Sequence, residues 1–154
     1  MPGMIEIRDK DTQGVLVVEL SDLLELLAAE GPLLAWAILD LYATGDLGDD
    51  RSMLDLERQI AESPTGLRLS WDELGALASA FTQVIDGVFV GCRDAASIPP
   101  LHSKAELYAR CEIVLEAVDS TLWAVYARDD RVLRRLRGAF HDIQMVPVPA
   151  SVPA

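Results

Sequence analysis

The fold is decided by residues 107–148, which read LYARCEIVLEAVDSTLWAVYARDDRVLRRLRGAFHDIQMVPV. Every second residue from Leu107 to Ala117 is apolar, and Glu112 and Glu116 lie between the apolar positions. Successive side chains of a strand point to opposite faces of the sheet. This alternation therefore predicts a long strand with one face on a core and the other face in water.

The same stretch continues as a turn, a second strand, a helix and a third strand. Asp119 and Ser120 interrupt the alternation, and residues 122–126 return as a β-rich partner strand. Residues 129–130 open a helix whose apolar residues fall on one side: Val132, Leu133, Leu136 and Phe140. Residues 143–148 read as the last short strand. This order of elements indicates the fold class.

The chain before this stretch predicts further strands and helices. Residues 14–20 form a short β-rich run that we expect to pair with residues 4–8. Asp22 resembles the start of a helix, because a carboxylate follows three residues later. Residues 33–43 read as a largely apolar helix, which is central in the fold or faces a partner.

Capping patterns and one interrupted strand complete the expected elements. Ser70 with Glu73 forms the clearest capping box in the chain, and Ser52 precedes a second helix in the same way. Residues 83–92 are β-rich and contain Asp86-Gly87. This dipeptide is a bulge or a two-residue hairpin turn. The short flanking pieces favour one bulged strand.

We predict an α+β fold, with a mostly antiparallel sheet packed by several amphipathic helices in a single pair of layers. Strands and helices mix irregularly, which favours this class over repeated strand–helix–strand units. Residues 1–148 are expected to form one domain. Residues 149–154 are expected to be a frayed, Pro-rich tail.

Net charge is the strongest global signal in the composition. The formal net charge is −12 and the sequence pI is about 4.4. Such a field repels nucleic acid and anionic membranes, and it speeds encounter with basic partners. The alternative is that the acidity only keeps a rather apolar protein soluble. We expect neither nucleic-acid nor membrane binding.

The chain carries no sign of export or of membrane insertion. No apolar stretch reaches the ~18 residues of a membrane span, and the N-terminus lacks the apolar region of a signal peptide. We therefore expect a cytoplasmic protein. Cys92 and Cys111 form no disulfide framework and read as structural thiols.

Known catalytic and cofactor motifs are absent from the sequence. It contains no nucleophile elbow, phosphate loop, dinucleotide fingerprint or zinc-ligand spacing, and its two histidines, His102 and His141, read as surface or capping residues. We expect no enzyme activity, no cofactor and no metal. Asp46, Asp49 and Asp50 offer oxygen ligands, but they lack the spacing and closing Glu of a calcium loop.

Our leading hypothesis is a protein that binds a basic protein partner through an acidic surface. Carboxylates speed the encounter, and a buried Trp rimmed by carboxylates is a strong anchor. The first-choice residues are Asp46, Asp49, Asp50, Asp55, Glu57 and Glu62. The second-choice residues, placed on the polar face of the sheet, are Glu112, Glu116 and Trp123.

A family resemblance agrees with this hypothesis. The stretches LDLYATGDLG (residues 39–48) and SWDEL (residues 70–74), together with the acidic charge and single-domain size, resemble the small cytoplasmic immunity proteins that bacteria use against polymorphic or contact-dependent toxins. The resemblance implies inhibition by tight binding, no cofactor, and a cognate toxin encoded nearby. It matches no family motif residue by residue, so no functional residues are carried over.

Two other functions stay open. The first is a homo-oligomeric structural or regulatory protein in which the apolar helix over residues 33–41 packs against a second copy, as in a homodimer. The second is a hydrolase that uses sheet carboxylates, with or without a metal, drawn from Asp86, Glu112, Glu116 and Asp119. The first alternative uses a surface that differs from the acidic one, whereas the second shares Glu112 and Glu116 with the second-choice residues.

Overall fold

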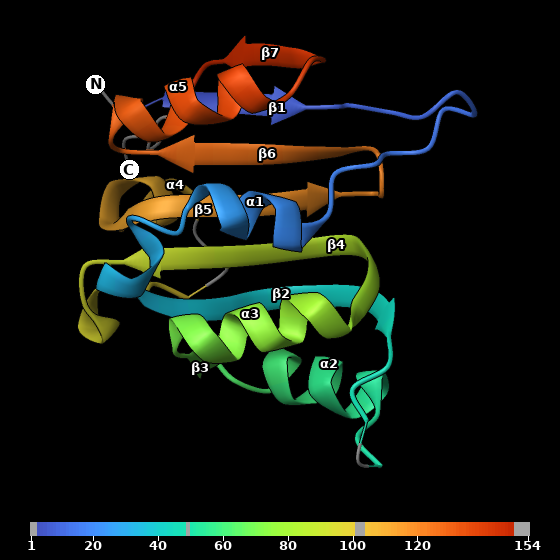
Figure 1. Ribbon diagram of the computed structural model, residues 1–154. Helices are drawn as coiled ribbons and strands as arrows, with labels where there is room; N and C mark the ends of the chain where they lie inside the picture. Colours follow the sequence, from blue (N-terminus) through green and yellow to red (C-terminus); the bar gives the residue numbers. More distant parts are fainter. Residues whose placement is uncertain (1–2, 49, 101–103, 150–154) are drawn as a thin grey trace.

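The computed structural model describes residues 3–48, 50–100 and 104–149, and it contains a seven-stranded antiparallel sheet (Figure 1). The strand order is β3-β2-β4-β5-β6-β1-β7. The strands are β1 (Gly3–Ile7), β2 (Ala35–Gly45), β3 (Leu67–Leu69), β4 (Phe81–Cys92), β5 (Cys111–Val118), β6 (Leu122–Ala127) and β7 (Ile143–Val146). The predicted α+β class with an antiparallel sheet is confirmed.

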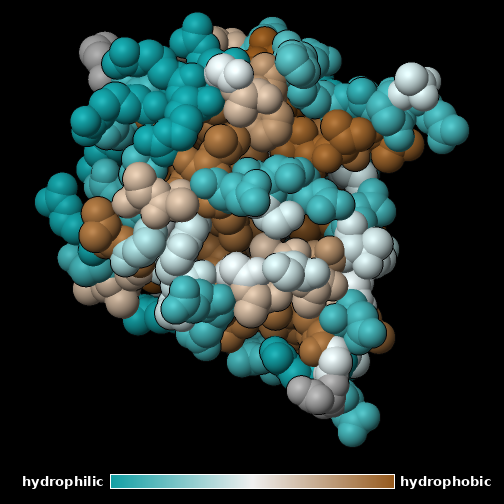
Figure 2. Space-filling model, in the orientation of Figure 1, coloured by the Kyte–Doolittle hydropathy of each residue, from teal (hydrophilic) through white to brown (hydrophobic). Residues whose placement is uncertain are grey.

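Helices cover the sheet unevenly. They are α1 (Leu20–Leu26), α2 (Met53–Ala61), α3 (Trp71–Ala80), α4 (Lys104–Arg110) and α5 (Asp130–Ala139). Figure 1 shows α5, α1 and α3 side by side over one face, α2 at the β2 edge, and α4 behind the sheet. Hydrophobic residues show between these helices in Figure 2, while the outer surfaces of α5 and α1 are largely hydrophilic and that of α3 is of intermediate hydropathy.

Two apolar clusters hold these layers together. The larger one lies between the sheet and helices α1, α3 and α5, and it contains Trp36, Phe89 and Trp123. The smaller one lies on the opposite face and contains Val114 and Tyr126. The second face of the predicted strand is therefore partly covered by protein rather than left in water, because residues around α4 pack on it.

The β5–β6 hairpin confirms most of the predicted stretch. Asp119 and Ser120 have φ angles of 50° and 57°, and the strands pair from Ile113–Ala127 to Val118–Leu122. A turn with two left-handed residues matches the twist of the strands that it joins. The strand begins later than predicted, because α4 occupies residues 104–110. Leu107 and Tyr108 are adjacent and both buried, which is a helical rather than an alternating pattern.

The prediction of a helix over residues 33–43 is wrong. This segment enters as a short 3₁₀ turn (Gly31–Leu33) and then forms β2, which pairs with β3 on one side and β4 on the other. Ile38 and Leu41 join the larger cluster, while Leu39 joins the smaller one. A strand buried on both faces reads as a continuous apolar run. The proposed homodimer helix over residues 33–41 therefore does not exist.

The N-terminal pairing also differs from the prediction. β1 pairs with β6 and β7 rather than with residues 14–20, and only an isolated bridge joins Lys10 to Leu16. Residues 8–19 instead project as an arm (Figure 1). The first helix starts at Leu20, because the side chains of Glu19 and Asp22 cap it reciprocally.

The predicted helix caps and the single bulged strand are confirmed. Ser70 and Glu73 form a capping box at α3, and Ser52 caps α2. Residues 81–92 are one strand, with register shifts against β2 just before Asp86. The predicted tail falls mainly on residues 150–154, which lie outside the described residues.

An ion pair joins the end of α1 to α5. The Arg135 guanidinium donates to Glu30 Oε1 at 2.7 Å, to Glu30 Oε2 at 3.0 Å and to the carbonyl oxygen of Leu26 at 2.7 Å. The hydrogen bond from Arg135 is the main cause of a lowered Glu30 pKa. Bidentate pairs of this kind fix geometry as well as charge.

We expect Glu30→Gln to remove an acid-sensitive part of the stability. Because the folded-state pKa of Glu30 is lowered from 4.5, the ionised carboxylate stabilises the fold above that pH, and this contribution is lost as pH falls through the folded-state pKa. The loss is at most about 1 kcal/mol, since both side chains are partly exposed. Urea unfolding of both proteins between neutral pH and about pH 3 measures it.

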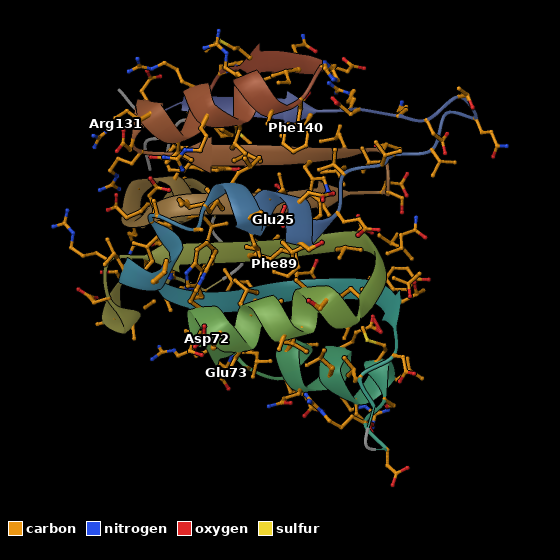
Figure 3. All side chains as sticks on the ribbon, viewed as in Figure 1. Glu25, Asp72, Glu73, Phe89, Arg131 and Phe140 are labelled. Carbon is orange, nitrogen blue, oxygen red and sulfur yellow. The ribbon has the colours of Figure 1, made fainter. Side chains whose placement is uncertain are left out.

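The matched control is Glu25→Gln, an exposed carboxylate on the outer side of α1 (Figure 3). It is expected to leave the pH profile unchanged. A stability difference between the wild type and Glu30→Gln that stays constant down to about pH 3 would contradict this role.

Candidate partner-binding surface

The acidic surface is built on α2 and the loop that precedes it. Ser52 Oγ accepts a hydrogen bond from the Asp55 amide at 3.0 Å and starts the helix. The loop is tied to the end of α3, because the Asp46 amide donates to the carbonyl oxygen of Ala80 at 3.1 Å. Asp46 Oδ1 then accepts from the Gly48 amide at 2.9 Å, which closes a local turn.

Glu57 points inward rather than toward a partner. Its Oε2 accepts a hydrogen bond from the backbone amide of Ala43 in β2 at 3.3 Å. Strand β3 pairs with β2 only from Trp36 to Ile38, so the following part of β2 presents its edge to α2. Glu57 therefore satisfies part of a strand edge that would otherwise be open.

The carboxylates outside this contact are mostly free of ion pairs. Within residues 46–73 the sequence holds eight carboxylates and three arginines. In the described part of this segment, the one ion pair is Asp55–Arg58 at 4.0 Å, between two strongly exposed side chains. Asp46, Asp50 and Glu62 are exposed and have no cationic partner among the described residues. The surface therefore keeps most of its negative charge.

At the opposite end of the sheet, around α5, carboxylates are paired with arginines. Arg131, Arg134 and Arg135 of α5 pair with Asp129, Asp130 and Glu30 at 2.7–2.9 Å. Arg131 lies at the start of α5 in Figure 3, at the opposite end of the sheet from Asp72 and Glu73, which lie at the start of α3 near the acidic edge. The molecule is thus electrically polarised along the sheet, with α2 at its negative end.

Apolar side chains accompany the acidic edge. Leu54 on α2 and Tyr42 on β2 are 72% and 57% exposed. Leu41 and Ala43 belong to the larger core cluster, so Tyr42 between them faces the opposite side of the sheet. A depression of about 370 Å³ also lies between α2 and α3, with Leu56 and Leu77 in its lining.

The structure does not bring Glu112 and Glu116 to this surface. They share the second face of β5, as predicted, but each is paired there. Glu112 lies 3.6 Å from Arg128 and 4.0 Å from Arg93, and Glu116 lies 2.9 Å from Lys104. Both carboxylates are largely neutralised by these cations.

The prediction that Trp123 is an exposed anchor is wrong. Its side chain is 1% exposed and packs beside Phe89, with ring centroids 6.1 Å apart. The indole Nε1 donates to the carbonyl oxygen of Val18 at 2.9 Å, so the buried polar atom is satisfied. Trp123 faces the larger cluster because Val125 and Ala127 share its side of β6.

Some predicted residues cannot be placed. Asp49 and His102 lie outside the described residues. The His141 side chain is exposed, and its backbone amide donates to the Asp9 carboxylate. In the described ranges, no group of three His, Cys, Asp or Glu side chains is arranged to hold a metal ion.

Comparisons with known proteins supply no further evidence. The chain matches no protein-family model, and neither curated proteins nor solved structures show significant similarity to it. Among the described residues, none of the helices has both the length and the apolar character needed to cross a membrane.

Sequence reasoning missed Tyr42 and Leu54. Tyr42 was read as part of an apolar helix, although strand alternation would have placed it opposite Leu41. Leu54 is 72% exposed, because Leu56 and Ile60 are the residues of α2 that face the core. Leu56 and Ile60 are four residues apart, so they lie on the same side of the helix. This spacing is the sequence signal that places Leu54 on a different side, away from the core.

We expect Trp123→Ala to destabilise the protein by about 3–5 kcal/mol, because it empties a fully packed core site. Glu62→Lys is expected to change the free energy of unfolding by less than about 0.5 kcal/mol, since this side chain is exposed and has no ion pair with any residue that the structure describes. Urea unfolding followed by far-UV circular dichroism measures both. Equal losses for the two variants would show that the core and surface assignments are wrong.

Proposed function

We propose that this protein binds and neutralises a basic protein partner through the acidic edge formed by α2 and the preceding residues 46–48 and 50. The observation that carries the proposal is that, within the described part of the chain, Asp46, Asp50 and Glu62 have no cationic partner, while the carboxylates beside α5 are held in close ion pairs. Unpaired surface charge raises the rate of encounter with a partner of opposite charge.

The exposed apolar residues at this edge supply the contacts that charge alone does not. Interface hot spots are apolar or aromatic side chains surrounded by polar residues that exclude water. Leu54 directly precedes Asp55 in α2, and Tyr42 projects from β2, the strand whose edge α2 covers. We propose Leu54 and Tyr42 as anchors, in the place first given to Trp123.

The biological form of this function that we favour is toxin neutralisation by an immunity protein. An anionic surface blocks a cationic enzyme, such as a nuclease, by occupying the region that binds its anionic substrate. The acidic edge and its apolar anchors fit this role. The proposal needs neither a cofactor nor a catalytic residue in this chain.

The test is co-purification of the tagged chain with the product of the neighbouring gene at low and high salt. We expect a stoichiometric complex with a basic protein, weakened by salt because exposed charges are screened. Asp55→Lys combined with Glu62→Lys is expected to weaken the complex about a hundredfold at low salt. Titration calorimetry of the purified pair measures this change.

The matched control is Glu25→Lys combined with Asp142→Lys. It changes the net charge by the same amount at exposed residues of α1 and of the segment after α5. We expect it to weaken binding by less than about fivefold, through the long-range field alone. If both double variants weaken binding equally, net charge rather than the α2 edge explains the interaction, and the proposed surface is wrong.

A further inference from the structure

Cys92 and Cys111 face each other at one end of the sheet. Cys92 is the last residue of β4 and Cys111 is the first residue of β5, and the two are partners in the strand register. Their Sγ atoms lie 2.7 Å apart, and both residues are fully buried. They are free thiols, so the pair is a dithiol rather than a disulfide.

The surroundings make the two thiols unequal. The hydrogen bond that Cys92 shares with the Cys111 thiol, with a smaller contribution from the nearby Arg110 guanidinium, lowers the pKa of Cys92. The same hydrogen bond and burial raise the pKa of Cys111. Cys92 is therefore the thiol of the pair that ionises more readily, and the thiolate is the nucleophile in cysteine chemistry.

We propose that Cys92 and Cys111 are a redox site that forms a reversible disulfide with a peroxide as oxidant. The Cys92 thiolate attacks one peroxide oxygen and breaks the O–O bond, which gives a sulfenic acid and, after protonation, water. The Cys111 sulfur then attacks the Cys92 sulfur, the S–S bond forms, and the hydroxyl group leaves as a second water. Two thiols and one hydrogen peroxide thus give one disulfide and two waters.

The disulfide would close a loop that contains the buried residues packed on the second face of the sheet. Residues 93–110 connect the two cysteines, and Ile98, Leu107 and Tyr108 from this connection are buried in the smaller core cluster. In the reduced protein, polar contacts also hold this connection: Lys104 forms an ion pair with Glu116 at 2.9 Å, and Arg110 Nη2 donates a hydrogen bond to the Ala96 carbonyl oxygen at 3.2 Å. A covalent bond between Cys92 and Cys111, at the two ends of this connection, restricts movement of the connection away from the sheet.

Access for the oxidant comes through the start of this connection. Both sulfurs are buried, but Arg93 and Asp94 follow Cys92 directly and are exposed. Local opening of a surface segment gives small reagents access to buried groups. Oxidation is therefore expected to be slow, limited by opening, and to protect the segment once it is complete.

The experiment treats the reduced full-length protein with hydrogen peroxide under native conditions and then alkylates it after denaturation. We expect the intact mass to fall by about 2 Da, no cysteine to be alkylated, and both changes to reverse with a phosphine reductant. The thermal midpoint of the oxidised protein is expected to rise by about 5–10 °C, because the cross-link restricts the unfolded chain.

Cys92→Ala and Cys111→Ala are the matched controls, and neither is expected to show the mass loss. Trypsin cleavage after Arg93 tests whether the disulfide restricts opening of the connection between the two cysteines. Oxidation is expected to slow this cleavage several-fold and to leave cleavage after the exposed Arg58 unchanged. The proposal is overturned if the oxidised wild type keeps two alkylatable thiols, gains oxygen on Cys92 or Cys111 instead of forming the disulfide, or forms only intermolecular disulfides. This result is independent of partner binding.

Discussion

The pairing of β2 with β4 is the constraint on which the rest of the structure depends. The two strands register from Ala35–Cys92 to Gly45–Phe81, and both contribute side chains to the apolar clusters on the two faces of the sheet. Such a pair needs cover on both sides. Helices α1 and α3 provide it on one face, the connection through α4 provides it on the other, and α2 protects the edge.

Sequence patterns predicted the parts of the fold that carry local signals. Ser70 and Glu73 satisfy each other's backbone amides within one turn, and α5 has one apolar side, so both were predictable from the sequence. Residues 33–45 were not, because burial on both faces removes the alternation that marks a strand. Trp123 was misplaced for the same reason, since both faces of β6 are apolar.

The candidate surface was predictable in composition but not in geometry. The excess of carboxylates over arginines in residues 46–73 is visible in the sequence. Which carboxylates are free is a tertiary property: Glu57 contacts a strand edge and Glu112 and Glu116 meet cations from distant segments. No local pattern reports such contacts, and the charge separation between α2 and α5 appears only when the strand order is known.

The short β3 strand and the helix beside it also decide how another molecule can approach this end of the sheet. Because α2 covers the β2 edge beyond β3, a partner cannot add a strand along that part of it and must recognise side chains instead. Two copies of the protein that meet through this edge repel each other, since each presents the same uncompensated charge. The same charge attracts a cationic surface in the proposed complex. If the proposed function holds, one feature both discourages association between copies and favours association with a basic partner.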